Sequence, residues 1–155
     1  MQRHGRRRQT RTAGGGVGNG ATRVDPRAAR KNHHELAVGS EAVLQLELAQ
    51  LKHEVFAVLF LDVQNRLLSF QPMFRGSLAQ TMVYPREVAK LALALGADGV
   101  VLAHNHPSGS TKPSHSDMLL TRTMQESLAL IDVTVRDHII VAQGKYLSMA
   151  EEGLM

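Results

Sequence analysis

Hydrophobic and polar positions recur with different periods along the chain, and each period predicts a different element. The first clear signal is helical, because leucines recur on one face at Leu44, Leu48 and Leu51. Ser40 is a suitable N-cap residue immediately before this pattern. We therefore predict that order begins near Ser40, with a helix that runs to about Lys52.

Two extended segments follow this helix. VFAVLFL (55–61) is entirely apolar, which is typical of a central strand buried on both faces. The polar turn DVQNR then leads to LLSFQPMF (67–74), which we predict to be the antiparallel partner of that strand. We expect Pro72 to interrupt this partner, because proline has no N–H to donate to a sheet.

The remaining pattern predicts two helices that alternate with strands. Pro85 suits the first turn of a helix that stops at Gly96, and Ser114 caps a second helix that continues to about Leu130. This order predicts a mixed β-sheet with helices packed on it, an α/β or α+β sandwich. The strands of this part are predicted over 99–104 (GVVLAH), 134–143 (TVRDHIIVAQ) and 145–149 (KYLSM).

Composition limits the chemistry that the chain can perform. Its 155 residues suffice for one domain with an extension, and the lack of cysteine excludes disulfides, thiolate zinc sites and a cysteine nucleophile. Any metal must therefore be held by nitrogen and oxygen ligands. No apolar run approaches the roughly 20 residues that span a bilayer, and the basic N-terminus lacks the apolar segment of a signal peptide. We expect a cytoplasmic protein without a membrane partner.

Charge divides the chain into two parts. Residues 1–35 contain nine Lys and Arg against two acidic residues, whereas the remaining 120 contain nine against twelve. We predict a disordered, basic, Gly/Arg-rich tail over 1–39 and a folded domain over 40–155. Such tails can bind nucleic acid weakly through counterion release. This one has no aromatic or patterned anchor, which favours a solvated extension, or an upstream stretch wrongly included in the gene model.

The candidate chemistry is concentrated at the end of the strand predicted over 99–104. His104 and His106 are two residues apart, so an extended chain points both side chains to one side. Asp117 lies three residues after Ser114, in a first helical turn where the helix dipole keeps a carboxylate ionised. Two neutral imidazoles and one carboxylate can provide three zinc ligands and leave a fourth position for water, as in catalytic zinc sites.

Each of these features also has a simpler interpretation. Ser114-x-x-Asp117 is an ordinary helix-capping box, and a His-x-His pair at a strand end is often just polar sequence at the surface. Their joint occurrence after a buried strand, with Pro107 stiffening the exit of the chain, favours a metal site.

The segment HNHPSGSTKPSHSD (104–117) carries a family resemblance. Its pattern of H-x-H, seven residues and then S-x-x-D resembles the metal motif of the JAMM (MPN-plus) metalloproteases. Together with FRGS, YPREV, DHIIV and the terminal EEGL, it is similar to the RadC-like branch of that family. The resemblance covers residues 40–155. It implies the MPN fold, a curved β-sheet flanked by helices, with zinc at the sheet edge.

The resemblance also implies roles for individual residues. His104, His106 and Asp117 would be the zinc ligands. Glu54 would be the general acid/base, which takes a proton from the zinc-bound water and passes it to the leaving amine. Ser114 would donate a hydrogen bond to the developing oxyanion. Without the resemblance, Glu54 is an ordinary solvated acid at a helix end.

Two further histidines lie near or beyond this motif. His115 follows His106 by nine residues and could compete for the metal, but at the start of a helix we expect it to face water. His138 follows Asp137 on a predicted strand. We expect His138 in the core or beside a zinc ligand, which it would orient.

These features support two functions of different classes. The first is a zinc-dependent hydrolase of JAMM type that cleaves a peptide or isopeptide bond, because a purely structural site needs neither a remote general base nor an oxyanion donor. The second is a DNA-repair-associated, RadC-like accessory protein with a structural or vestigial metal site, which the basic tail favours. A nuclease that uses the same metal is a weaker third interpretation.

The evidence for a DNA-binding function is confined to the tail. The RadC branch implies a helix-hairpin-helix segment that would contact DNA, and residues 1–39 show no matching helical pattern. The predicted domain has an excess of acidic residues and few aromatic residues, so it lacks the electrostatic pattern that is typical of nucleic-acid binding.

Overall fold

The computed structural model of the chain describes residues 41–78 and 82–155. The predicted N-cap at Ser40 and the predicted tail over 1–39 lie outside these described residues. The helices and strands are β1 (Val55–Leu61), β2 (Leu67–Arg75), α2 (Pro85–Leu95), β3 (Gly99–Asn105), α3 (His115–Ala129), β4 (Thr134–Ala142) and β5 (Lys145–Ser148).

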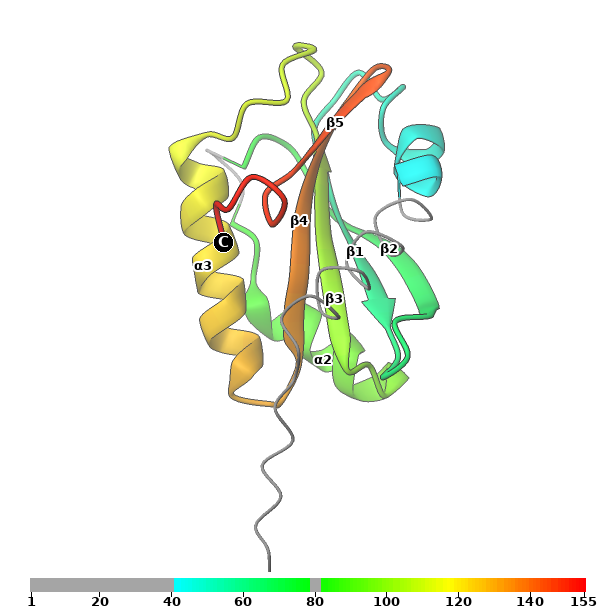
Figure 1. Cartoon of the computed structure of the whole chain (residues 1–155), viewed down its shortest axis with the longest axis vertical. Coiled ribbons are helices and arrows are strands. Elements are labelled where there is room, and N and C mark those ends of the chain that lie inside the picture. The colour runs from blue at the N-terminus through cyan, green and yellow to red at the C-terminus, as the bar shows by residue number, and fades with distance from the viewer. Residues whose placement is uncertain (1–40, 79–81) are drawn as a thin grey trace, which may run out of the picture.

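The strands form one five-stranded mixed sheet in the order β2-β1-β3-β4-β5 (Figure 1). β1 pairs antiparallel with both β2 and β3, and β4 pairs antiparallel with β5. β3 and β4 are parallel, and α3 provides the crossover that parallel neighbours require. The predicted mixed sheet with packed helices is confirmed.

Helices cover both faces of this sheet. On one face, Val88 and Ala92 of α2 and Met124 and Leu128 of α3 join the apolar side chains of β1 and β3 in one core cluster. On the other face, residues 41–47 are helical and contribute Leu44 to a second cluster. Because β1 and β3 are covered on both sides, all seven residues of each are buried, as the apolar run in β1 predicts.

The first helix is shorter than the sequence predicts. The helical segment ends at residue 47, and a turn follows over residues 48–50. Leu48 is still fully buried and Leu51 packs against the same cluster, so the apolar pattern reports burial correctly but extends past the helix. The chain has to turn here in order to enter β1.

The predicted interruption of β2 at Pro72 is a bulge in an otherwise continuous strand. Phe56 pairs with Phe74, and the next residue, Ala57, pairs with Pro72, so the register shifts by one residue at this point. β2 is an outer strand, where a missing N–H is tolerated.

The other two predicted helices, α2 and α3, are confirmed, and their ends agree with the prediction to within one residue. α2 starts with Pro85 in its first turn and ends at Gly96, whose φ of 64° is left-handed. α3 is capped by Ser114 and ends at Ala129, one residue before the predicted end. Within the two described ranges, no helix is long and apolar enough to cross a membrane.

Candidate metal centre

The candidate site is built at the carboxyl end of β3, the central strand of the sheet. His104 is fully buried and pairs with Phe56 of β1 and Ile140 of β4. The N–H of His106 donates to the carbonyl of Val141 (2.9 Å), which extends the ladder by one residue beyond β3. The two imidazole rings consequently lie on the same side, with centroids 4.7 Å apart. The site thus lies at the end of the central strand and not on an outer strand.

Helix α3 brings Asp117 to these histidines. Asp117 Oδ2 accepts the backbone N–H of Ser114 (2.6 Å), and Ser114 Oγ accepts the backbone N–H of Asp117 (3.1 Å), so the capping box is present. The same carboxylate lies 3.2 Å from His104 Nε2 and 3.6 Å from His106 Nε2. Asp117 therefore completes the cap of α3 and at the same time faces both histidines.

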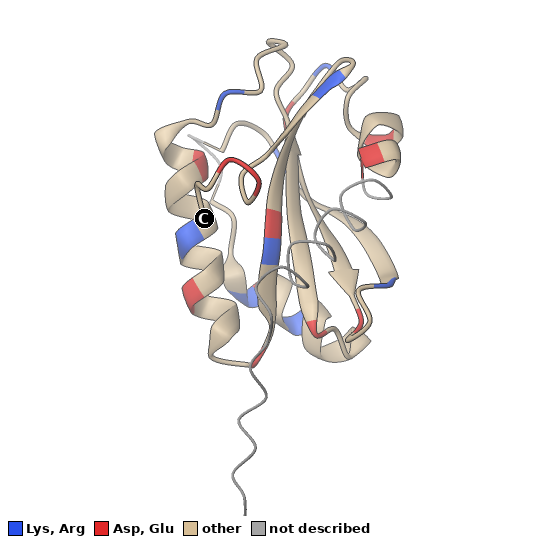
Figure 2. Cartoon of the chain, in the orientation of Figure 1, with Lys and Arg blue, Asp and Glu red and all other residues tan. Residues whose placement is uncertain are grey.

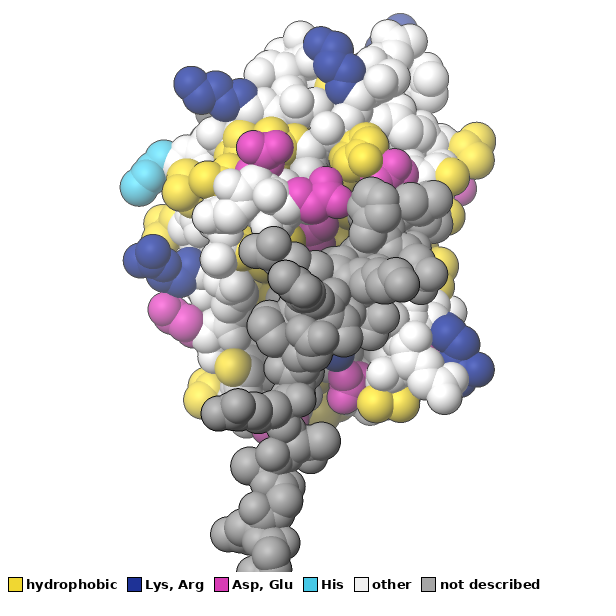
Figure 3. Space-filling model, viewed as in Figure 1, with side chains coloured by type: hydrophobic (Ala, Val, Ile, Leu, Met, Phe, Trp, Pro, Cys, Tyr) yellow, Lys and Arg dark blue, Asp and Glu magenta, His cyan; other side chains and the backbone are white. Residues whose placement is uncertain are grey.

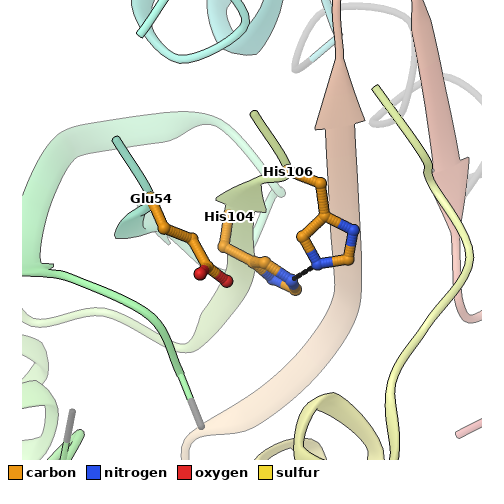
Figure 4. A group of neighbouring side chains, drawn as sticks. All are labelled: Glu54, His104 and His106. Carbon is orange, nitrogen blue, oxygen red and sulfur yellow. Dashed lines mark hydrogen bonds between the residues drawn. The ribbon is translucent and has the colours of Figure 1, made fainter. Parts of the chain in front are cut away.

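Glu54 reaches the same point from the start of β1. A carboxylate oxygen of Glu54 and one nitrogen each of His104 and His106 all lie within 4.8 Å of one another. Figure 4 shows the Glu54 carboxylate directed towards His104. The antiparallel pairing of β1 with β3 explains how a residue 50 positions upstream joins the cluster.

Asn105 fixes the segment that carries Glu54, a role that the sequence analysis did not identify. Its side chain is buried, and its Oδ1 accepts the backbone N–H of Val55 (2.7 Å). Its Nδ2 donates to the carbonyl oxygens of His53 (2.9 Å) and Leu51 (3.4 Å). The sequence does contain one indication of this role. Asn105 lies between two histidines on a strand, so its side chain points to the opposite face of the sheet.

The loop after β3 determines the proton arrangement of His106. His106 Nδ1 lies 2.8 Å from the carbonyl oxygen of Ser110. A carbonyl oxygen can only accept, so Nδ1 carries the proton and the neutral ring has its lone pair on Nε2. This nitrogen is 2.9 Å from His104 Nε2.

His138 and Thr121 form a buried layer behind His104. His138 is fully buried, as predicted, and its Nε2 lies 2.8 Å from His104 Nδ1. Thr121 Oγ1 lies 2.6 Å from His138 Nδ1 and 2.7 Å from the carbonyl oxygen of Asp117. Burial lowers the pKa of His138 well below its usual 6.5, and the charge of His104 lowers it further. Thr121 was not identified from the sequence, where its signal is a position one helical turn after Asp117.

The electrostatics of the site favour an ionised carboxylate. Burial raises the pKa of Asp117, but the hydrogen bond and charge of His104, with the N–H and hydroxyl of Ser114, outweigh burial and hold the pKa well below its usual 3.8. Asp117 is therefore an anion at neutral pH. His115 is exposed, as predicted, and lies outside the cluster.

A cleft opens beside the exposed edge of His106. It has a volume of about 640 Å³ and is lined by residues 49–52, residues 106–109 and Gln143. The cleft thus borders one member of the cluster, His106, and lies between the turn before β1 and the loop after β3.

Comparison with known proteins agrees with this architecture. The model of the RadC-like JAB domain family matches residues 38–154. The chain is 64% identical over 112 residues to a UPF0758 protein of Albidiferax ferrireducens and 63% identical to one of Verminephrobacter eiseniae. Each match covers 72% of this chain, which spans about half the length of these relatives (48% and 47%). The chain belongs to the RadC-like JAB domain family, as its motifs predict.

Proposed function

We propose that this domain is a zinc-dependent hydrolase of JAMM type that cleaves a peptide or isopeptide bond. The proposed metal ligands are His104, His106 and Asp117, with Glu54 as general acid/base and Ser114 as oxyanion donor. The observation that carries the proposal is the convergence of two imidazole nitrogens 2.9 Å apart with a carboxylate 3.2 and 3.6 Å from them.

The chemistry of this donor set fits a metal ion. The neutral His106 ring has its lone pair on Nε2, and the two Asp117 oxygens are acceptors. Atoms of this kind repel one another unless a cation, either a proton or a metal ion, lies among them. Imidazole nitrogen and carboxylate oxygen are ligands that zinc accepts, and three protein ligands are typical of catalytic zinc.

The surrounding residues suit hydrolysis. A zinc ion held by these residues would lower the pKa of a water molecule to about 7 and would polarise a substrate carbonyl. The Glu54 carboxylate takes the proton of the attacking water and passes it to the leaving amine. Ser114 Oγ accepts from Asp117 N–H, and its own proton, which stabilises the Asp117 carboxylate in the free protein, turns to the developing oxyanion when the substrate is bound.

The cleft beside His106 supports a peptide as the substrate. It is of the size that holds small ligands or a few residues of an extended chain. Polar side chains of Gln50, Ser108 and Gln143 line it, and these can bond to the N–H and C=O groups of a peptide.

The test of this proposal compares the wild type with Glu54→Gln. The variant keeps the size of the side chain but cannot take a proton, so turnover should fall by about 10²–10⁴ while zinc content stays equal. Zinc is measured by metal analysis, and turnover with a library of peptides and isopeptide-linked peptides. A Glu54→Gln protein with wild-type turnover would refute the assigned role.

A second candidate function is a DNA-associated accessory role, and it depends on residues 1–35 with their nine Lys and Arg. In the part of the chain that Figure 2 colours by charge, Lys and Arg are distributed over several elements among acidic residues. On the face shown in Figure 3, the basic side chains lie apart from one another and form no continuous patch. This distribution favours the hydrolase for the described residues. Nucleic-acid affinity that is lost when residues 1–35 are deleted, and that falls steeply with salt, would support the accessory role.

A further inference from the structure

We propose that Thr121 and His138 are positioning residues that fix the tautomer of His104, so that its Nε2 lone pair faces the metal position. The metal-orienting role of these two residues rests on the proposed function. Its evidence is a separate, buried chain of hydrogen bonds that runs from Asp117 through Thr121 and His138 to His104.

The direction of the chain is set at Thr121. Its hydroxyl has one proton but contacts three groups: the Asp117 carbonyl oxygen at 2.7 Å, His138 Nδ1 at 2.6 Å and the Met149 sulfur, a weak acceptor, at 3.7 Å. A carbonyl can only accept, so the hydroxyl proton points to Asp117. The reverse direction would leave two oxygens 2.7 Å apart without a proton between them. His138 Nδ1 must therefore supply the proton of the second contact.

The next step passes through His138. Its ring is fully buried, and its nitrogens contact a hydroxyl and an imidazole, with no carboxylate among the described partners. A buried imidazolium without an anionic partner is costly, so the ring is neutral and has a single proton. That proton is on Nδ1, which makes Nε2 an acceptor. The proton in the 2.8 Å contact with His104 therefore belongs to His104 Nδ1.

These hydrogen bonds determine which nitrogen of His104 can bind a metal. With Nδ1 committed as donor to His138, the proton that His104 would release to a metal ion is the one on Nε2, which faces His106 and donates to the Asp117 carboxylate when no metal is bound. The neutral ring then has its lone pair on Nε2. The side chains of His104, Thr121 and His138 are at most 2% exposed, so water does not reach them to replace a missing partner. Asp117 takes part twice, because its carbonyl anchors the chain and its carboxylate faces the lone pair that the chain produces.

A matched pair of variants tests this arrangement. Thr121→Val removes the hydroxyl with little change in shape, and Thr121→Ser keeps it. In the valine variant, His138 loses its acceptor at Nδ1 and can move its proton to Nε2. Two protons would then point at each other between His138 Nε2 and His104 Nδ1. The His104 proton would therefore move to His104 Nε2, the nitrogen that has to bind the metal. Affinity for zinc should fall by about 10- to 100-fold in Thr121→Val and stay near the wild-type value in Thr121→Ser.

The direct readout is the position of the protons. Long-range ¹H–¹⁵N correlation spectra of the metal-free, full-length protein, recorded well above the usual histidine pKa of about 6.5, show which nitrogens carry hydrogen. We expect protons on Nδ1 of both His138 and His104 in the wild type and in Thr121→Ser, and on Nε2 of His138 in Thr121→Val. A wild-type His138 protonated on Nε2 would overturn the inference, even if the valine variant failed to fold.

This experiment separates the inference from the proposed function. Predicted tautomers in a wild-type protein that does not bind zinc would refute the metal site and leave the hydrogen-bond chain standing. Equal zinc affinity and equal tautomers in all three folded proteins would refute the role of Thr121 and leave the metal site standing.

Discussion

The two histidines of the candidate site are held in different ways. The buried half of the site consists of His104, His138 and Thr121, in which side chains from β3, β4 and α3 bond to one another away from water. The loop half consists of His106 and residues 107–110, in which a backbone carbonyl holds a ring whose side chain is 16% exposed. The contrast indicates that one ligand is fixed by the core, whereas the other lies on a loop that borders the cleft.

The largest expected effect comes from removing each histidine in turn. His104→Ala and His106→Ala should both abolish zinc binding and turnover, because two protein ligands hold zinc poorly. Only His104→Ala should also lower the free energy of unfolding, by roughly 1–3 kcal/mol, because it leaves His138 Nε2 buried without a partner. Zinc content and denaturant unfolding measure the two effects. His115→Ala is the control and should keep both, and full zinc occupancy in His106→Ala would contradict the ligand assignment.

The next effect separates the two roles of Ser114. Ser114→Ala should reduce turnover by about 10²–10³ if the hydroxyl donates to the oxyanion. It should also cost about 1 kcal/mol of stability, because the N-cap of α3 is lost. Turnover and unfolding are measured on one sample. A loss of stability with unchanged turnover would reduce Ser114 to a helix cap.

A smaller effect is expected on the opposite face of β3. Asn105→Ala leaves the N–H of Val55 buried without its partner and should cost roughly 1–3 kcal/mol of stability. It should also displace Glu54 and lower turnover by up to about 10², with zinc retained. Gln45→Ala is the matched control, since this amide bonds to the carbonyls of Ala142 and Lys145, away from Glu54. Equal turnover in the two variants would show that Asn105 does not position the base.

The parts of the fold that were predictable are those encoded locally. The all-apolar run of β1, the proline at the start of α2 and the serine cap of α3 each report a nearby physical requirement. The spacing of His104 and His106 likewise fixes their common side, because side chains alternate along a strand. Pro72 also marks the irregularity in β2, whereas the end of the first helix depends on where the chain must go next, which no short window contains.

The supporting residues of the site depend on non-local register. His138 reaches His104 because β3 and β4 pair in parallel with Leu102 opposite His138, and nothing near His138 in the sequence specifies that register. Thr121 and Asn105 are ordinary polar residues until the sheet and α3 are assembled. The donor atoms and the supporting histidine, His138, could thus be named in advance, whereas Thr121 and Asn105 could not.

The central claim is that a metal ion binds where the two Nε2 atoms and Asp117 converge. X-ray absorption at the zinc edge of the purified protein tests it most directly. We predict about one zinc per chain with nitrogen and oxygen neighbours at about 2.0–2.2 Å and the scattering pattern of two imidazoles. A spectrum without imidazole scattering, or a protein that takes up no zinc in its presence, would contradict the claim.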